Sequence, residues 1–158
     1  MSGHQASNSV PEAHYSVEGY TPDENILHLI NLARNRCIAA LDAELALHGL
    51  TSAQWGILRL INEGSERTAA DLCRRYDMDP GAVTRMLTKL EEKGLIERER
   101  SNADKRVVEL ALTGAGQQMT GEGLAAVVNI LNHAVRDFST NELETLKITL
   151  RRLVANMK

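Results

Sequence analysis

The sequence has few aromatic residues, few prolines and only two cysteines. Phe, Trp and Tyr together make up 3% of its 158 residues, and Pro occurs three times. Most apolar residues are Leu, Ala, Ile and Val, a mixture that favours helix over sheet, so we expect a mainly α-helical fold. The length and the 43% hydrophobic content are sufficient for one hydrophobic core.

Long hydrophobic runs are also missing. The opening residues contain no apolar run behind a basic start, so they do not resemble a signal peptide. No later stretch is long and apolar enough to cross a bilayer. We therefore expect a cytoplasmic protein without a membrane partner.

The sequence offers little for catalysis or metal binding. Cys37 and Cys73 lie far apart and outside any CxxC or Cys/His spacing, so we expect reduced thiols and no zinc site. The histidines are His4, His14, His28, His48 and His133, and their positions follow no ligand spacing. A Gly-rich phosphate loop, HExxH and GxSxG are all missing. The sequence thus predicts no catalytic residues, cofactor or metal, and no enzyme.

The charge is unevenly distributed along the chain. The formal net charge is −3, which is unusual for a protein that binds nucleic acid. However, residues 67–106 hold ten basic and eight acidic residues, whereas residues 1–66 hold three and eight. The middle of the chain is therefore locally basic, and regional asymmetry is more informative than the net charge.

A polar segment and a long helix are predicted first. Residues 1–21 are Ser-rich and lack periodicity, so we expect a flexible arm there. From Asp23, apolar residues recur every three or four positions, which predicts an amphipathic helix that ends at Gly49. Its apolar positions are Ile26, Leu29, Ile30, Ala33, Cys37, Ala40, Leu41 and Leu45.

Three shorter helices are predicted next, each after a residue type that caps helices. The candidate caps are Thr51 or Ser52, Thr68 and Asp79. The apolar positions are Trp55, Leu58 and Ile61 in the first helix, Ala69 or Ala70, Leu72, Cys73 and Tyr76 in the second, and Val83, Met86, Leu87 and Leu90 in the third. Each set fits one buried helix face.

The period then changes from helical to alternating. Residues 95–100 and 107–112 alternate every second position around the polar loop SNADKR, which predicts a two-stranded hairpin. Three helices followed by a hairpin are typical of a winged helix-turn-helix. Two long helices, 113–135 and 139–157, follow, and their apolar steps of three and four residues are typical of helix-on-helix packing.

The predicted helix that begins at Pro80 carries the best candidates for DNA contact, because the second helix of such a pair enters the major groove. If its apolar positions face inward, the opposite side shows Gly81, Thr84, Arg85, Thr88 and Lys89. Arg85 suits a bidentate bond to guanine, and Lys89 suits a phosphate. The alternative is an ordinary solvated helix face.

The loop of the predicted hairpin is a second candidate. Lys105 and Arg106 at its tip could reach a flanking minor groove, where narrow A/T-rich DNA attracts guanidinium groups. An ordinary charged turn, with Asp104 capping locally, remains the alternative.

Together these motifs resemble the MarR family of transcription regulators. The run DKRVVELALT, residues 104–113, matches the family's D-x-R-x5-L-T wing signature, and DPGAVTRMLTKLEEKGL resembles its recognition helix. The resemblance implies that Asp104 braces the wing, that Arg106 enters the minor groove, and that a homodimer binds a palindromic double-stranded operator. We therefore expect an arm over 1–21, dimerisation regions over 22–50 and 113–158, and a DNA-binding lobe over 51–112. The candidate dimer contacts are Leu143, Leu146, Leu150 and Leu153.

The resemblance also implies a small phenolic or aromatic-carboxylate effector that releases the operator, bound between the dimer helices and the DNA-binding lobe. The candidate ligand residues are His28, Arg34, Arg36, Cys37, Trp55 and Arg98. Each has a structural alternative: a core anchor for the tryptophan, salt bridges for the arginines and packing for His28. Two other functions stay open, namely a redox-sensing repressor that uses Cys37 and a winged-helix module that binds protein.

Overall fold

The computed structural model describes residues 13–64, 67–76, 78–101 and 104–157. The chain divides into two units, residues 1–35 and 36–158. In the first unit, the hydroxyl of Tyr15 accepts a hydrogen bond of 3.1 Å from the backbone N–H of Ile26, where α1 (Ile26–Ala46) begins. Of the predicted flexible arm, residues 1–12 lie outside the described residues, and the side chains of 13–21 are exposed.

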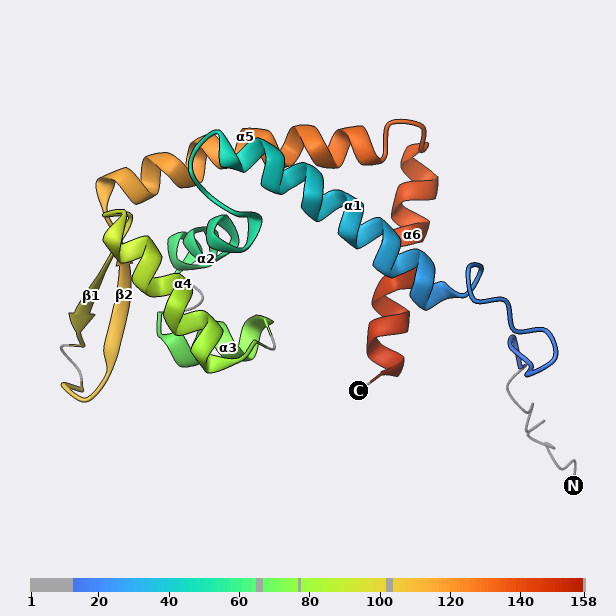
Figure 1. The fold of residues 1–158 in the computed structure, drawn as a ribbon, viewed down its shortest axis with the longest axis horizontal. Coiled ribbons are helices and arrows are strands. Elements are labelled where there is room, and N and C mark those ends of the chain that lie inside the picture. Colours follow the sequence, from blue (N-terminus) through green and yellow to red (C-terminus); the bar gives the residue numbers. More distant parts are fainter. Residues whose placement is uncertain (1–12, 65–66, 77, 102–103, 158) are drawn as a thin grey trace, which may run out of the picture. The chain divides into compact units, whose positions relative to one another are not determined.

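The second unit contains the three predicted short helices (Figure 1): α2 (Ser52–Glu63), α3 (Ala69–Tyr76) and α4 (Pro80–Glu92). Thr51 forms a capping box with Gln54 at the start of α2, and Gly64 ends this helix in the left-handed conformation, with φ 68°. The carboxylate of Asp79 caps α4 by accepting the backbone N–H of Ala82 at 2.8 Å. The predicted caps at Thr51 and Asp79 are thus confirmed, because each satisfies an amide that has no partner within its helix.

The predicted hairpin is also present. Strands β1 (Ile96–Arg100) and β2 (Val108–Leu112) pair antiparallel, with Arg98 opposite Leu110. The outer edge of β2 has a further partner, because Leu110 donates its backbone N–H to the carbonyl of Arg67 at 2.8 Å. This bond ties the wing to the residues just before α3.

The core of the second unit contains buried apolar side chains from α2, α3, α4 and the hairpin, together with Leu45 at the end of α1 and Ala126 of α5. Fully buried members are Leu45, Ile57, Leu58, Leu60, Leu72, Val83, Leu87 and Leu90. The predicted inward positions of α2 and α4 all belong to this core or pack against it. The fold class predicted from sequence, a mainly helical winged helix-turn-helix with a hairpin wing and long flanking helices, is confirmed.

Helix α5 (Gly114–Ala134) packs on α2 through a stripe of small residues. Gly116, Thr120 and Gly123 are buried, and a Cβ atom on Gly123 would lie 2.3 Å from the indole of Trp55. The indole N–H of Trp55 donates to the backbone carbonyl of Thr120 at 3.1 Å. The close approach of α5 to α2 thus depends on the absence of a side chain at Gly123.

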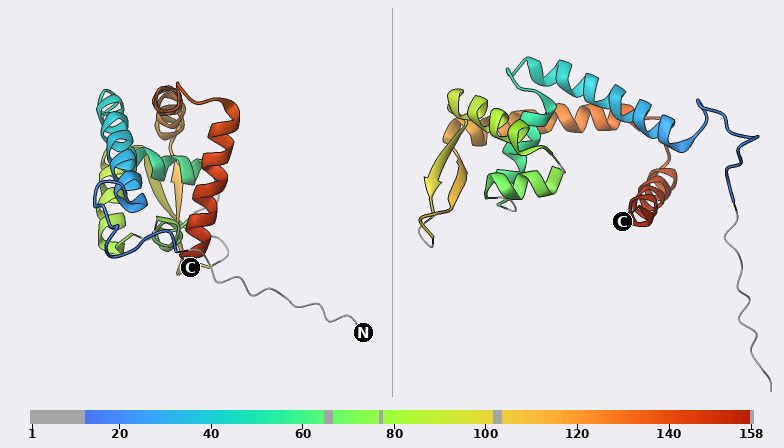
Figure 2. Two further views of the ribbon diagram at one scale, coloured as in Figure 1. Left: turned by 90° about the vertical axis from the view of Figure 1, so that its right-hand side faces the viewer. Right: turned by 60° about the horizontal axis from the view of Figure 1, so that its bottom comes forward.

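The long helices leave many apolar side chains exposed. Helix α6 (Thr140–Asn156) turns sharply away from the end of α5 (Figures 1 and 2), and none of its residues is buried. In α1, Leu45 alone among the helix residues is buried. No helix in the described part of the chain is long and apolar enough to cross a membrane.

Candidate nucleic-acid interface

Helix α4 has one buried and one exposed face, in the arrangement predicted from its sequence. Val83, Leu87 and Leu90 are 0–2% exposed. The side chains of Thr84, Arg85, Thr88 and Lys89 are exposed on the remaining surface, and Gly81 is half-buried. The core therefore fixes the rotation of α4 about its axis, and with it which side chains face solvent.

The two cations of this face are unpaired. Neither Arg85 nor Lys89 has a side-chain hydrogen bond or ion pair with another described residue. A Cβ atom on Gly81 would lie 2.9 Å from Oδ2 of Asp79 and 3.3 Å from Nη1 of Arg85. Gly81 thus leaves room both for the Asp79 cap and for the guanidinium of Arg85, which lies over the start of the helix.

The two threonine hydroxyls of the face already have partners. Thr84 donates its hydroxyl to the carbonyl of Pro80 at 2.8 Å, and Oγ1 of Thr88 accepts from Arg98 at 3.5 Å. An approaching base would therefore meet the methyl group of Thr84 and the remaining lone pairs of both hydroxyls.

The start of α3 is held by a carboxylate. Asp71 accepts the hydroxyl of Thr68 at 2.8 Å and the backbone N–H of Thr68 at 3.0 Å, and it pairs with Arg74. The hydrogen bond from the Thr68 hydroxyl holds the pKa of Asp71 below its usual value, with the Thr68 and Arg67 amides and Arg74 acting in the same direction. Asp71 is therefore an ionised anchor for the helix that supports α4.

The wing tip is organised by Asp104. Its carboxylate accepts the backbone N–H of Arg106 at 3.0 Å, and its carbonyl accepts the N–H of Val107 at 2.9 Å. The side chains of Lys105 and Arg106 are exposed, while residues 102–103 of the SNADKR loop lie outside the described residues. These bonds hold the backbone that carries Arg106 in a tight turn.

Arg98, a candidate ligand residue, lies beside α4. Its Nε lies 3.3 Å from Oε2 of Glu91, so the wing strand β1 is joined to α4 by an ion pair. Arg98 also lines a cavity of about 220 Å3 with Thr84 and Leu87 of α4. Sequence reasoning missed the Arg98–Glu91 pair, because a separation of seven residues across a turn gives no helical or strand spacing.

The other candidate ligand residues lie in separate places. Trp55 is 8% exposed, and its indole N–H is satisfied in the core. His28 and Arg34 belong to the first unit and are exposed. Arg36 and Cys37 together line a cavity of about 390 Å3. Both cysteines are free thiols, each half-buried.

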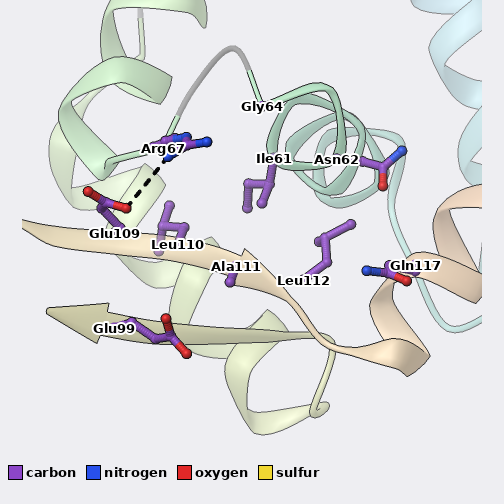
Figure 3. A pocket seen from close by; sticks show the side chains of 10 residues that line it. All are labelled: Ile61, Asn62, Gly64, Arg67, Glu99, Glu109, Leu110, Ala111, Leu112 and Gln117. Atoms are coloured by element: carbon purple, nitrogen blue, oxygen red, sulfur yellow. Dashed lines mark ion pairs between the residues drawn. The ribbon is translucent and has the colours of Figure 1, made fainter. Parts of the chain in front are cut away.

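A third cavity, of about 400 Å3, lies along β2 and the end of α2 (Figure 3). Its apolar side is formed by Ile61, Leu110 and Leu112. Arg67 and Glu109 approach across it to 3.9 Å, and Glu99 from β1 adds a second carboxylate. None of the predicted ligand residues lines this cavity. No group of three or more His, Cys, Asp or Glu side chains among the described residues could hold a metal ion.

Comparison with known proteins agrees with this geometry. A family model described as the MarR family matches residues 48–107. The multiple antibiotic resistance protein MarR of Escherichia coli is 28% identical over 134 residues, which cover 84% of this chain and 91% of that protein. A crystal structure of a mutant of that MarR, complexed with operator DNA, is 28% identical with a TM-score of 0.73, over 79% of this chain and 90% of that one.

Two further crystal structures are similar. A probable transcriptional regulator from Pseudomonas aeruginosa is 30% identical with a TM-score of 0.75, over 83% of this chain and 98% of that one. Bordetella bronchiseptica BpsR, described with regulation of its DNA binding by 6-hydroxynicotinic acid, shares the fold at 21% identity, with a TM-score of 0.77 over 85% and 96%. These relatives are transcriptional regulators, which confirms the expectation that the chain is not an enzyme. The match over the helix-turn-helix and the first strand of the wing, together with the similarity along most of the chain, shows that this protein belongs to the MarR family of winged-helix transcriptional regulators.

Proposed function

We propose that this protein is a cytoplasmic homodimeric repressor that binds a palindromic operator. In this proposal α4 enters the major groove and the wing tip reaches the flanking minor groove. A small aromatic carboxylate or phenolic effector releases the operator, because it binds better to a conformation that does not fit DNA.

The observation that carries the proposal is the pair of unpaired cations on α4. Arg85 and Lys89 are exposed on the side opposite the buried Val83 and Leu87. Neither cation is occupied by an ion pair within the described chain, and guanine and phosphate are the natural partners of Arg and Lys on such a helix. Arg106 at the wing tip adds a third exposed cation.

The exposed apolar side chains of the long helices support a homodimer. Leu131, Leu146 and Leu150 are 51%, 40% and 37% exposed, although they recur at helical spacing. Large apolar side chains left exposed on long helices indicate an interaction site, and a second copy of the same chain supplies a matching surface.

The effector class is supported by a relative and by residue chemistry. BpsR is described with regulation of its DNA binding by 6-hydroxynicotinic acid, an aromatic carboxylate. In this chain, Arg36 is exposed and has no hydrogen bond or ion pair with another described residue. A guanidinium group in a partly apolar cavity suits a carboxylate.

The test is binding to the DNA upstream of the protein's own gene, measured by fluorescence anisotropy at increasing salt. We expect a specific complex at low salt whose affinity falls steeply with salt, because bound counterions are released from the phosphates. A chain that gives no specific complex at low salt is not an operator-binding repressor, and the protein-binding alternative would then take precedence.

Two variants separate base contact from phosphate contact. Arg85→Ala should weaken operator binding by about 1–3 kcal/mol and relax specificity. Lys89→Ala should weaken binding to all sequences alike and reduce the salt slope by about 1. The matched controls are Arg59→Ala and Lys147→Ala, whose cations pair within α2 and α6. If both α4 variants bind like the parent, the groove assignment is wrong.

A further inference from the structure

Helices α1 and α4 end with the same sequence pattern. Residues 45–50 read LALHGL and residues 90–95 read LEEKGL, so each helix closes on Leu-x-x-x-Gly-Leu. In both, the glycine adopts the left-handed conformation, with φ 69° at Gly49 and 67° at Gly94. The amide that follows each glycine donates to the carbonyl of the first leucine of its pattern at 3.0 Å. Each helix therefore ends in a Schellman motif, which fixes the direction in which the chain leaves it.

The leucines of both patterns lie in the core of the second unit. Leu45, Leu50, Leu90 and Leu95 are all buried. An apolar contact on each side of the glycine commonly accompanies a Schellman motif and holds its turn in place. The two helix ends are therefore fixed on one close-packed core, and a contact between them joins two rigid parts.

A lysine side chain joins the two helix ends. The ammonium of Lys93, the residue before Gly94, donates to the backbone carbonyl of Gly49 and lies 3.3 Å from Oε1 of Gln54. Gln54 is buried, and the same oxygen accepts the backbone N–H of Thr51 at 3.2 Å in the capping box of α2. One charge at the end of α4 thus bonds to the end of α1 and to the start of α2.

The contact between Lys93 and the end of α1 is electrostatically favourable. The carbonyls at a helix C-terminus carry the negative end of the helix dipole, so an ammonium beside them is stabilised. Hydrogen bonds from a charged donor are also stronger than those between neutral groups. Three other charged side chains of α4 have different surroundings: Arg85 and Lys89 are unpaired among the described residues, and Glu91 pairs with Arg98 of the wing. Lys93 differs from them because it reaches toward α1.

The end of α1 is also held by α5 and α2. Nδ1 of His48 lies 3.5 Å from Oε2 of Glu122 in α5. Asp42 of α1 accepts the backbone N–H of Ser52, the first residue of α2, at 2.7 Å. Polar contacts from three helices thus position the end of α1, and Lys93 supplies the contact from α4.

We propose that Lys93 is a positioning residue that sets the orientation of α4 relative to the end of α1, and through it the spacing of the operator half-sites that the dimer recognises. The inference rests on the proposed function for a homodimeric operator complex, and it goes further by assigning a determinant of half-site spacing. In a dimer held by its long helices, the attachment of each lobe to those helices fixes the separation of the two copies of α4. One base pair changes the half-site separation by about 3.4 Å and rotates one half-site by about 35° relative to the other. A change in the orientation of α4 is therefore measurable as a change in spacing preference.

The test uses the operator upstream of the protein's own gene, derivatives with the half-sites one or two base pairs closer or farther apart, and a fragment with a single half-site. Affinities of the full-length protein are measured by fluorescence anisotropy at one salt concentration, and urea unfolding of each variant is measured in parallel. Lys93→Met removes the ammonium but keeps the apolar stem of the side chain. Lys93→Arg keeps a cation that can donate to the same carbonyl. Arg59→Met is the matched control, because the cation of Arg59 pairs with Glu63 within α2.

The parent should prefer one spacing at least tenfold over the spacings one base pair away. Lys93→Met should reduce this preference to threefold or less, while its affinity for the single half-site stays within twofold of the parent. Lys93→Arg and Arg59→Met should keep the preference of the parent.

A role in stability alone predicts a different result. Lys93→Met would then weaken binding to every spacing and to the single half-site by the same factor, in parallel with a lower free energy of unfolding. That result, or an unchanged spacing preference, would overturn the assignment of Lys93 and leave the repressor proposal intact. So would a parent that binds its operator specifically but accepts all spacings alike. A parent that forms no specific complex would overturn the proposed function, and this inference with it.

Discussion

The winged lobe and the long helices use similar Leu-rich helical sequence but bury it to different extents. In the lobe, Leu58, Leu72 and Leu90 are completely buried, whereas in the long helices Leu131 and Val154 are 51% and 60% exposed. Both regions have apolar residues at helical spacing, so the pattern alone does not distinguish them. The difference shows that the lobe completes its core within one chain and that the long helices do not.

Helix α5 belongs to both regions. Its small residues Gly116 and Gly123 face the lobe, while Leu124, Val128 and Leu131 are exposed on its surface. One helix thus carries both a tight intramolecular contact and an apolar face that this chain leaves exposed.

The largest effect is expected from placing charge on the unsatisfied face. The double variant Leu146→Lys/Leu150→Lys should weaken dimerisation by about 4 kcal/mol or more, since each buried Leu contributes at least about 2 kcal/mol and a buried ammonium adds a desolvation cost. Light scattering should show half the mass of the parent, and operator binding should fall with it.

The matched control shifts the same two charges by one residue. Thr145 and Thr149 are exposed, and their hydroxyls donate to carbonyls of their own helix. We expect Thr145→Lys/Thr149→Lys to keep the parent mass. An unchanged mass for the leucine variant would refute α6 as a dimer surface, and the comparison of the two regions would need another explanation.

The next largest effect is expected at the face of α5 that packs closely against the winged lobe. A Cβ atom on Gly116 would lie 2.0 Å from the backbone oxygen of Leu95, an atom that cannot move without shifting the wing. Gly116→Ala should therefore lower the free energy of unfolding by about 3 kcal/mol, at the upper end of the usual cost of overpacking. Gly121→Ala, with no atom within 4 Å of its Cβ, should raise it by about 0.5–1 kcal/mol through helix propensity. Urea unfolding of the two variants decides the matter, and equal stabilities would show that α5 does not approach the lobe this closely.

Much of the winged lobe could be predicted because its signals are local. The cap at Asp79, the capping box at Thr51 and the alternation of residues 95–100 each lie within a few residues of the element they define. The buried face of α4 followed from periodicity, and with it the exposure of Arg85 and Lys89.

The surroundings of the candidate ligand residues could not be predicted, because they depend on tertiary contacts. Trp55 and Arg36 are both plausible in a ligand pocket, but a hydrogen bond to Thr120 places the indole in the core. His133 and Arg136 line the same cavity as Arg36, but their spacing relative to Arg36 is not one that a sequence pattern could detect. The glycine positions 116 and 123 of α5 were a usable signal, since two small residues seven apart share a helix face.

A smaller effect is expected in how the stability of each region depends on pH. The lowered pKa of Asp71 means that its ionised form stabilises the folded lobe, so this contribution is complete above the ordinary carboxyl pKa and is lost as the pH falls through the folded-state pKa. Asp71→Ala should lower the unfolding free energy by about 1 kcal/mol at neutral pH, and the difference from the parent should shrink in acid. Glu144→Ala, on exposed α6, should change stability less, although the hydrogen bond from Lys147 also lowers the pKa of Glu144. A difference for Asp71→Ala that is constant with pH would contradict an ionised anchor.

The smallest effect concerns the ion pair between α4 and the wing, the two parts of the lobe that we propose contact DNA. If the Arg98–Glu91 pair fixes the wing relative to α4, Glu91→Gln should lower the ratio of operator to non-specific affinity by a factor of two to three, about 0.5 kcal/mol, as expected for an exposed ion pair. A purely electrostatic role predicts an unchanged ratio, because removing an acid near DNA would tighten binding to every sequence alike. Titrations with operator and scrambled DNA at one salt concentration distinguish the two. Glu92→Gln removes a neighbouring acid whose side chain has no hydrogen bond or ion pair with another described residue, so it supplies the electrostatic baseline against which the ratio is compared.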